Sequence, residues 1–395
     1  MNSRERVTAA LEHRCPDRVP YDLSGTHVTG IHQIAYRNLC RYLRVDDSPA
    51  PFADVIQQVV IPSDGLLERL QVDTRGLFPL CSHNWNLKGE DKGDYLEYID
   101  EWGFVQHFPK DGYWWSLVKS PLNSSAVDLE QILHYPWPQA VLPERIAGLR
   151  RQAEKFQAEG KIVMLKGLCA GIFEMGQRLR GMENFLCDIL ADPKNAEIVL
   201  DKFTELKMQF WDMALDELGD VVDIVVESDD YGTQESQLIS PNTFRKLMKP
   251  RLKDLFSLIK KKLREKKSGA ERGWLFFHSC GNVRPIIPDF IEIGVDILNP
   301  VHVNAHGMEP AQLKKDFGSE VTFWGGGVDT QNVMPHGTTE NVREDVKRNL
   351  EALMPEGGFV FNTVHNIQPD APPENIMAMW ETLQEYGKYG GGGKQ

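Results

Sequence analysis

The stretch Trp274-Leu-Phe-Phe-His-Ser-Cys-Gly281 joins a short apolar run to two residues that can bind metal. Four apolar residues in succession predict a strand that is buried on both faces. His278 and Cys280 lie two positions apart, and in an extended chain such residues project from the same face. Zn²⁺ prefers Cys sulfur and His nitrogen, so the pair predicts half of a zinc site. The alternative is a His and a buried Cys that pack at a strand end without a metal.

A second strand-like run, Gly358-Phe-Val-Phe-Asn-Thr-Val-His365, also ends in a histidine. From residue 144 to this run, apolar strand-like segments alternate with helical ones, which indicates parallel βαβ units. Together with one or two earlier units they predict an α/β fold of the (β/α)8 TIM barrel type. The alternative is an open doubly wound sheet, although no G-x-G-x-x-G follows a first strand. The predicted strands cover residues 160–167, 220–227, 274–278, 295–300, 321–326 and 359–364.

The part of the chain before residue 144 is less regular. Alternating residues on either side of a Pro-Lys-Asp-Gly turn at 109–112 predict a β-hairpin insertion around 95–118. We expect a single barrel domain over 1–389 that carries this insertion, followed by a flexible tail over 390–395. The other predicted elements are N-terminal helices over 3–12, 34–46 and 54–71 and a first strand over 19–23.

Composition and charge exclude several classes of protein. Hydrophobic residues make up 41% and charged residues 26%, an ordinary balance for a globular chain of 395 residues. The formal net charge of -13 argues against a nucleic-acid partner. Six Cys without paired spacing do not form a disulfide framework. With no apolar run of about 18 residues, we expect a cytoplasmic protein without a membrane partner.

Polar and ionisable residues gather where the predicted strands end. In barrel enzymes the functional groups lie at the C-terminal ends of the strands. Buried charges cost free energy unless they are paired or bound to a metal. Several ionisable residues at the C-terminal end of one barrel therefore indicate a ligand site. The strand ends carry Lys166, Glu227, Asp229, Asp230, His278, Cys280, Asn299, Asp329, Asn362 and His365.

Several motifs, in this order, resemble the uroporphyrinogen decarboxylase superfamily. The resemblance is clearest over residues 220–388 and implies a (β/α)8 barrel, in agreement with the alternation of strands and helices. The motifs are His-Ser-Cys-Gly-Asn at 278–282, Gly-Val-Asp-Ile-Leu-Asn-Pro at 294–300, Trp-Gly-Gly-Gly-Val-Asp-Thr at 324–330, Gly-Thr at 337–338 and Gly-Gly-Phe-Val-Phe-Asn at 357–362.

One activity implied by the resemblance is decarboxylation of a tetrapyrrole or another carboxylate. True decarboxylases carry an N-terminal motif of the type Arg-Gln-Ala-Gly-Arg, whose cations hold the carboxylates of the substrate. Here the corresponding region, residues 15–27, contains Arg18 as its single arginine. One cation would hold a substrate with many carboxylates poorly, so decarboxylation is the alternative prediction.

The leading prediction is a corrinoid-dependent methyltransferase, because members of that branch bind zinc through an H-x-C pair and a distant Cys. His278 and Cys280 match the pair, and His365 lies where the distant Cys would be. Imidazole is as suitable a zinc ligand as thiolate, so the resemblance implies a Zn²⁺ site of these three residues. His365 and the Asp-Glu-Trp-Gly sequence at 100–103 make the chain resemble members that act on methyl ethers, as in O-demethylation, or on methylamines. The resemblance to members that transfer methyl groups onto a thiol is weaker.

The resemblance also suggests roles for the remaining polar residues. The predicted catalytic residues are Glu227, as a fourth zinc ligand or proton donor, and Asp229. The alternative for Glu227 is an ion pair with a Lys or Arg of the rim. Contacts with a small methylated substrate are predicted for Tyr231, Gln234, Asn299, Asp329 and Asn362.

The methyl acceptor is expected to be a corrinoid (cobalamin) on a separate partner protein. The reason is that the chain has no D-x-H-x-x-G motif with which to bind a corrinoid itself. A third hypothesis is a non-catalytic barrel that binds a small molecule or a tetrapyrrole.

Overall fold

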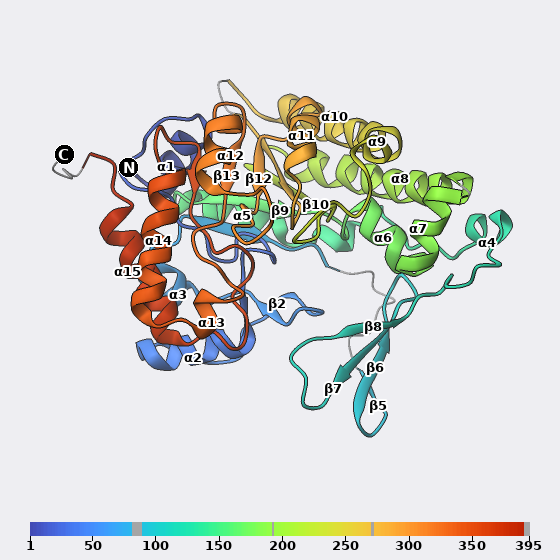
Figure 1. The fold of residues 1–395 in the computed structure, drawn as a ribbon, viewed down its shortest axis with the longest axis horizontal. Helices are drawn as coiled ribbons and strands as arrows, with labels where there is room; N and C mark the ends of the chain where they lie inside the picture. Colours follow the sequence, from blue (N-terminus) through green and yellow to red (C-terminus); the bar gives the residue numbers. More distant parts are fainter. Residues whose placement is uncertain (81–88, 192, 270–271, 391–395) are drawn as a thin grey trace.

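The computed structural model describes residues 1–80, 89–191, 193–269 and 272–390, and its centre is a parallel sheet surrounded by helices (Figure 1). Of the tail predicted over 390–395, only Gly390 lies within the described residues. The sheet has seven strands in the order β14-β13-β12-β11-β10-β9-β4. They are β4 (Thr74–Leu77), β9 (Ile162–Lys166), β10 (Ile224–Ser228), β11 (Trp274–His278), β12 (Ile297–Asn299), β13 (Thr322–Trp324) and β14 (Phe359–Val360).

The segment predicted as the first strand closes this sheet into a barrel. Tyr21 pairs in parallel with Phe361, directly after β14. On the other side, the Asp73 N–H, directly before β4, donates to the Tyr21 carbonyl at 2.9 Å. The segment 19–23 therefore takes the eighth place between β14 and β4. The predicted (β/α)8 barrel is confirmed.

Side chains of the strands alternate between the barrel interior and the surrounding helices. On β11, Trp274 and Phe276 belong to the inner apolar cluster, whereas Leu275 and Phe277 belong to the larger outer one. Helix α1 (Ser3–Leu11) reaches the inner cluster from the N-terminal end of the strands, where the Gly358 N–H donates to the Ala10 carbonyl. The C-terminal end of the barrel is left for a ligand site, as in barrel enzymes generally.

Helices of varied length pack around the strands (Figure 1). Among the described residues, none combines the length and apolar character needed to cross a membrane. After α1 they are α2 (Gln33–Leu43), α3 (Asp64–Arg69), α4 (Leu129–Leu133), α5 (Leu149–Ala158), α6 (Ile172–Arg180), α7 (Met182–Ala191), α8 (Pro193–Leu218), α9 (Pro241–Thr243), α10 (Lys249–Lys266), α11 (Ile287–Glu292), α12 (Pro310–Phe317), α13 (Val333–His336), α14 (Thr339–Leu353) and α15 (Pro373–Tyr386).

The helix predicted over 54–71 is wrong over its first half. The chain there forms the short strands β2 (Phe52–Asp54) and β3 (Val59–Val60), which pair with each other. Strand β3 also pairs with β1 (Ile31–His32). Only α3 is helical, and Ser63 caps it by accepting from the Leu66 N–H. The reason is tertiary, since β3 is buried against β1, which overrides the local helical spacing.

The region of the predicted hairpin forms a four-stranded antiparallel sheet, which projects from the barrel (Figure 1). Its strands are β5 (Glu90–Asp91), β6 (Tyr95–Ile99), β7 (Val105–Pro109) and β8 (Ser116–Lys119). The predicted turn joins β7 to β8, with the Gly112 N–H donating to the Pro109 carbonyl at 2.8 Å. The Trp115 N–H donates to the Ile56 carbonyl at 2.9 Å, which attaches the sheet beside the mouth of the barrel.

Candidate metal centre and its cavity

Three side chains with metal-binding atoms converge at the C-terminal end of the barrel. The ligand atoms of His278, Cys280 and His365 all lie within 4.8 Å of one another. His278 ends β11, and because it shares the parity of Trp274 and Phe276 it faces the barrel interior. Its Nε2 lies 3.4 Å from the Cys280 Sγ. The structure thus brings together the three residues predicted as zinc ligands, and their binding of zinc remains a prediction.

Amide side chains fix the orientation of both imidazoles. Asn299 Nδ2 donates to the Trp324 carbonyl at 2.7 Å, which leaves its Oδ1 to accept from His278 Nδ1 at 2.5 Å. With the proton on Nδ1, His278 Nε2 presents a lone pair beside Cys280. In the same way His365 Nδ1 lies 2.9 Å from Asn366 Oδ1. Partners of this kind orient metal-binding histidines and tune their basicity.

The donor set fits a zinc ion. Zn–N bonds of about 2.0–2.1 Å and Zn–S bonds of about 2.3 Å place tetrahedral ligand atoms roughly 3.3–3.8 Å apart. The 3.4 Å between His278 Nε2 and Cys280 Sγ falls in that range. Burial lowers the pKa of His365 to about 4 and also lowers the pKa of His278, so both rings are neutral, as a metal ligand must be. Burial raises the pKa of the Cys280 thiol, so metal binding would release its proton.

His278 and His365 line a cavity of about 540 Å³. Carboxylates gather in its wall, and of these the sequence analysis named only Asp230 as a candidate ligand-binding residue of the rim. Asp230 is the nearest to the metal-binding atoms, because its Oδ1 accepts from the Cys280 N–H at 2.7 Å and lies 3.6 Å from His278 Nε2. Further ionisable lining residues are His27, Asp54, Asp100, Glu101, Lys166, Glu174 and Arg178.

Strand parity explains why Asp230 and not Glu227 reaches the cavity. On β10, Ile224 and Val226 point into the barrel, so Glu227 points outward, towards α8. There its carboxylate pairs with Lys207 at 2.8 Å and accepts from Trp211 Nε1 at 2.5 Å. This is the ion pair foreseen as the alternative for Glu227, although the partner belongs to a helix and not to the rim. The alternation of side chains along β10 could have been used on the sequence alone. It predicts that Ser228 and Asp230, and not Glu227, face the barrel interior.

Asp229 also points outward and forms bonds at the start of α6. Its carboxylate accepts from the N–H groups of Phe173 and Glu174, both at 2.9 Å, and from the Tyr231 hydroxyl at 2.6 Å. Burial raises the pKa of Asp229 to about 8. Neither Glu227 nor Asp229 lines the cavity that contains His278. Their catalytic roles remain predictions, while their contacts are those of structural residues.

Of the residues predicted to touch substrate, only Asn299 contacts the metal-binding group, and it does so through His278. The other four are engaged elsewhere. The Tyr231 hydroxyl donates to Asp229, and Gln234 Nε2 donates to Gln331 Oε1 at 2.6 Å. The Asp329 carboxylate accepts from the Gln331 and Asn332 N–H groups. Asn362 Nδ2 donates to the Asp22 and Thr29 carbonyls.

Comparison with known proteins assigns the family. The model of the uroporphyrinogen decarboxylase (URO-D) family matches residues 107–386, which is most of the chain. The chain belongs to the URO-D family. The resemblance read from the sequence motifs is thereby confirmed, and the URO-D fold agrees with the closed barrel. No curated protein sequence matches the chain.

Among solved structures, a methyltransferase from Methanosarcina mazei shares the fold of this URO-D protein along its whole length. The match has a TM-score of 0.66 at 18% identity and covers 98% of this chain and 99% of that one. Two further solved structures are more distant. A D-psicose 3-epimerase matches with a TM-score of 0.33 at 9% identity, covering 65% of this chain and 84% of that one. An endoglucanase from an uncultured bacterium matches with a TM-score of 0.35 at 11% identity, covering 62% of this chain and 76% of that one.

Proposed function

We propose that this protein is a zinc-dependent methyltransferase. In this proposal it moves a methyl group from a small methylated donor, of the methyl ether or methylamine type, to the cobalt of a corrinoid. The corrinoid is carried by a partner protein, and both proteins are cytoplasmic. The observation that carries the proposal is the convergence of the His278, Cys280 and His365 ligand atoms within 4.8 Å beside a cavity of about 540 Å³. The shared fold of a methyltransferase supports it.

The three side chains would hold zinc and leave one coordination position towards the cavity. Zinc, when bound, is a Lewis acid that stabilises negative charge on a leaving oxygen or nitrogen. In the overall reaction the methyl carbon separates from that donor atom and bonds to cobalt(I), which supplies the electron pair. The donor atom keeps the pair of the broken bond and takes up a proton. The chain must therefore orient the donor, exclude water and provide that proton.

Glu174 is our candidate for the proton donor. It belongs to α6 and lines the same cavity as His278 and His365. Burial, and then the negative charge of Asp230, raise the pKa of Glu174 against the smaller, opposite effect of Arg178, whose Nη2 lies 3.8 Å from its Oε1. A carboxyl group whose pKa is raised by its surroundings can act as a general acid.

The charges of the cavity favour this reaction over decarboxylation of a polycarboxylate. Among the described lining residues, carboxylates outnumber Lys166 and Arg178. Lys166 Nζ also lies 3.6 Å from Asp54. Arg18, the single arginine of the N-terminal motif region, pairs with the buried Asp73 at 2.8 Å. A substrate with several carboxylates would therefore meet net repulsion.

Metal content and methyl transfer test the proposal together. We expect about one zinc per chain in the purified protein and methylation of a reduced corrinoid protein by a methyl donor. His278→Ala and Cys280→Ser should abolish both. The matched controls are His107→Ala, whose ring pairs with Glu97 in the antiparallel sheet, and Cys187→Ser, an exposed thiol on α7. Full activity in His278→Ala would refute the proposal, and turnover of a carboxylate without zinc or corrinoid would favour the decarboxylase.

A further inference from the structure

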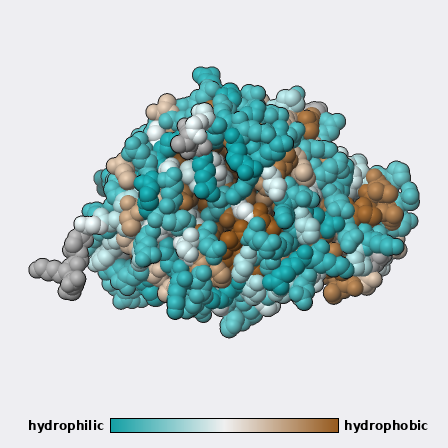
Figure 2. Space-filling model, turned by 90° about the horizontal axis from the view of Figure 1, so that it is seen from above, coloured by the Kyte–Doolittle hydropathy of each residue, from teal (hydrophilic) through white to brown (hydrophobic). Residues whose placement is uncertain are grey.

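A second cavity lies on the side of the molecule that carries the antiparallel sheet. The side turned away from the sheet is mostly hydrophilic (Figure 2). Between the sheet and α6, a cavity of about 540 Å³ opens to solvent, since its lining residues Val118 and Met182 are 50% and 48% exposed. We call it the outer cavity, and we call the cavity that contains His278 and His365 the reaction cavity. Water can therefore approach α6 from two directions.

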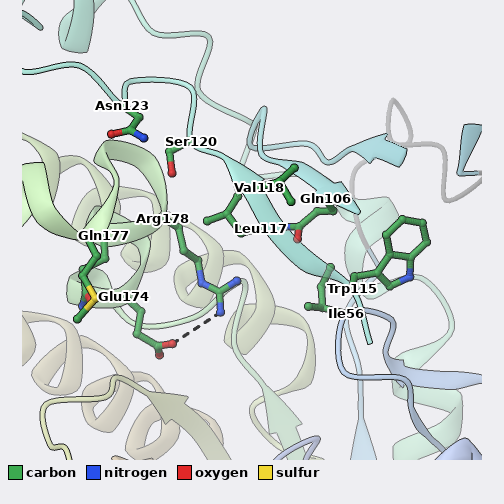
Figure 3. Close-up of a pocket in the computed structure, with 11 residues that line it drawn as sticks. Ile56, Gln106, Trp115, Leu117, Val118, Ser120, Asn123, Glu174, Gln177 and Arg178 are labelled. Atoms are coloured by element: carbon green, nitrogen blue, oxygen red, sulfur yellow. Dashed lines mark ion pairs between the residues drawn. The ribbon is translucent and has the colours of Figure 1, made fainter. Parts of the chain in front are cut away.

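Two charged residues of α6 belong to the wall between the cavities. Glu174 and Arg178 line both the outer cavity and the reaction cavity. Figure 3 shows them rising from α6, with Leu117 and Val118 of β8 on the other side of the outer cavity. Their side chains are 23% and 37% exposed, respectively. Glu174, our candidate for the proton donor, is therefore a side chain that both cavities share.

The proposed reaction leaves Glu174 without its proton after each methyl transfer. The leaving oxygen or nitrogen binds this proton with a lone pair, and Glu174 becomes a carboxylate, which needs one proton from water before the next turnover. The methyl carbon must lie between the leaving atom and cobalt, so the donor and the partner protein close the reaction cavity and exclude water. The outer cavity stays open to solvent at that moment, because it is not the cavity in which the donor lies.

Arg178 is placed to control the charge of Glu174. The two residues lie one turn apart on α6 and form the ion pair marked in Figure 3. The cation favours the carboxylate, so it opposes the larger effects of burial and of Asp230, which raise the pKa of Glu174. The residues that the sheet contributes to the outer cavity, such as Leu117 and Val118, carry no charge. Glu174 also interacts electrostatically with Asp229, Tyr231, His278 and Cys280.

We propose that the outer cavity is the proton path of the reaction centre. Glu174 gives its proton on the side of the reaction cavity and takes a new proton from water in the outer cavity. Arg178 is a positioning residue, which stabilises the carboxylate at the wall between these two transfers. The inference rests on the proposed methyl transfer and adds the route by which its proton arrives. The antiparallel sheet then has a function of its own, because β8 forms the far wall of that route.

Chemical labelling of carboxyl groups tests the two directions of access without a methyl donor. A water-soluble carbodiimide with glycinamide converts an accessible carboxyl into an amide, and mass spectrometry of peptides gives the rate at each residue. Asp230 is the internal reference, because it lines the reaction cavity and its side chain is 36% exposed. Val118→Trp, which fills the outer cavity, should slow labelling of Glu174 about tenfold, as for an access barrier raised by about 1.4 kcal/mol, and leave Asp230 unchanged.

Two matched variants separate the outer cavity from other effects of a new indole. Ile99→Trp places it on the same sheet, at a residue that is 59% exposed and lines neither cavity, and should change neither rate. Leu80→Trp narrows the reaction cavity from a position that is 58% exposed, and should slow labelling of Asp230 but not of Glu174. An unchanged rate of Glu174 in Val118→Trp, or equal slowing of both carboxyls in Leu80→Trp, would overturn the separate path.

The role of Arg178 has a readout of its own. A protonated carboxyl has an infrared C=O band that a carboxylate lacks, and the difference between the wild type and Glu174→Gln isolates the band of Glu174. In Arg178→Leu the cation is gone, so the band should persist to higher pH than in the wild type. Arg178→Lys keeps the charge and should return the titration towards that of the wild type. Identical titrations in Arg178→Leu and the wild type would refute this role.

The two proposals fail in different ways. If the protein holds zinc and methylates a corrinoid protein, but Glu174 is labelled only through the reaction cavity, the proton path alone is wrong. If labelling of Glu174 follows the outer cavity but the protein takes up no zinc, the methyltransferase proposal is wrong. The delivery of a proton to a leaving group then fails with it, while the access of solvent to Glu174 through the outer cavity stands.

Discussion

The buried ion pair between Lys207 and Glu227 gives the sharpest test of which carboxylates are structural. Their side chains are 1% and 2% exposed, and Nζ lies 2.8 Å from Oε2. Lys207 also donates to the Cys169 and Ala170 carbonyls at 3.1 and 3.0 Å. The ammonium therefore links α8 to the loop after β9. Glu227→Gln would leave this cation buried without a counter-charge.

Removing one partner of a buried pair costs about 3–5 kcal/mol, because the remaining charge is uncompensated. We expect Glu227→Gln to lower the free energy of unfolding by that amount. Lys207→Met combined with Glu227→Met removes both charges and should recover about 2 kcal/mol or more of the loss. The matched control is the exposed pair of Lys155 and Asp64, at 54% and 53% exposure, where Asp64→Asn should cost at most about 1 kcal/mol.

Urea unfolding followed by circular dichroism measures the stabilities, and metal analysis of the same samples measures zinc. If Glu227 is structural, Glu227→Gln loses stability while its folded fraction keeps the zinc content of the wild type. Wild-type stability together with lost zinc in Glu227→Gln would refute the reasoning. It would restore Glu227 to the metal site as the fourth ligand.

Three further predictions concern the orientation of His278, the closure of the barrel and the protonation of Asp100 between β6 and β7. Asn299→Ala should weaken zinc binding by about 10- to 100-fold in a chelator competition while the protein stays folded, because Asn299 orients His278. Asp73→Asn should lower the free energy of unfolding by about 3–5 kcal/mol in urea, because the buried Asp73 pairs with Arg6 and Arg18, both at 2.8 Å. Burial raises the pKa of Asp100 from 3.8 to about 6, so the folded state binds more protons than the unfolded state between these values. Stability should therefore fall as pH rises from about 4 to 6, by up to about 3 kcal/mol relative to Asp100→Asn, and parallel curves for the two proteins would contradict this.

The alternation of strands and helices could be predicted from the sequence, because each strand of a barrel is a local apolar run between turns. It predicted the barrel, whereas the place of the segment 19–23 between β14 and β4 came from the structure. The same local reasoning failed over residues 54–60, where apolar residues at helical spacing form β2 and β3 instead. Pairing with β1 decides that segment, and the partners lie more than 20 residues away in the sequence.

The candidate metal site also depends partly on local sequence and partly on tertiary structure. His278 and Cys280 share a face because a strand has a period of two, which the sequence alone determines. Their meeting with His365, 85 positions after Cys280, depends on the closure of the barrel, which brings the ends of β11 and β14 to one rim. Parity along β10 also separates Asp230, in the cavity, from Glu227, beside Lys207. The chain by itself determines which residues can bind a metal, and the curvature of the sheet decides which of them meet, because only closure turns neighbouring strand ends into one concave surface.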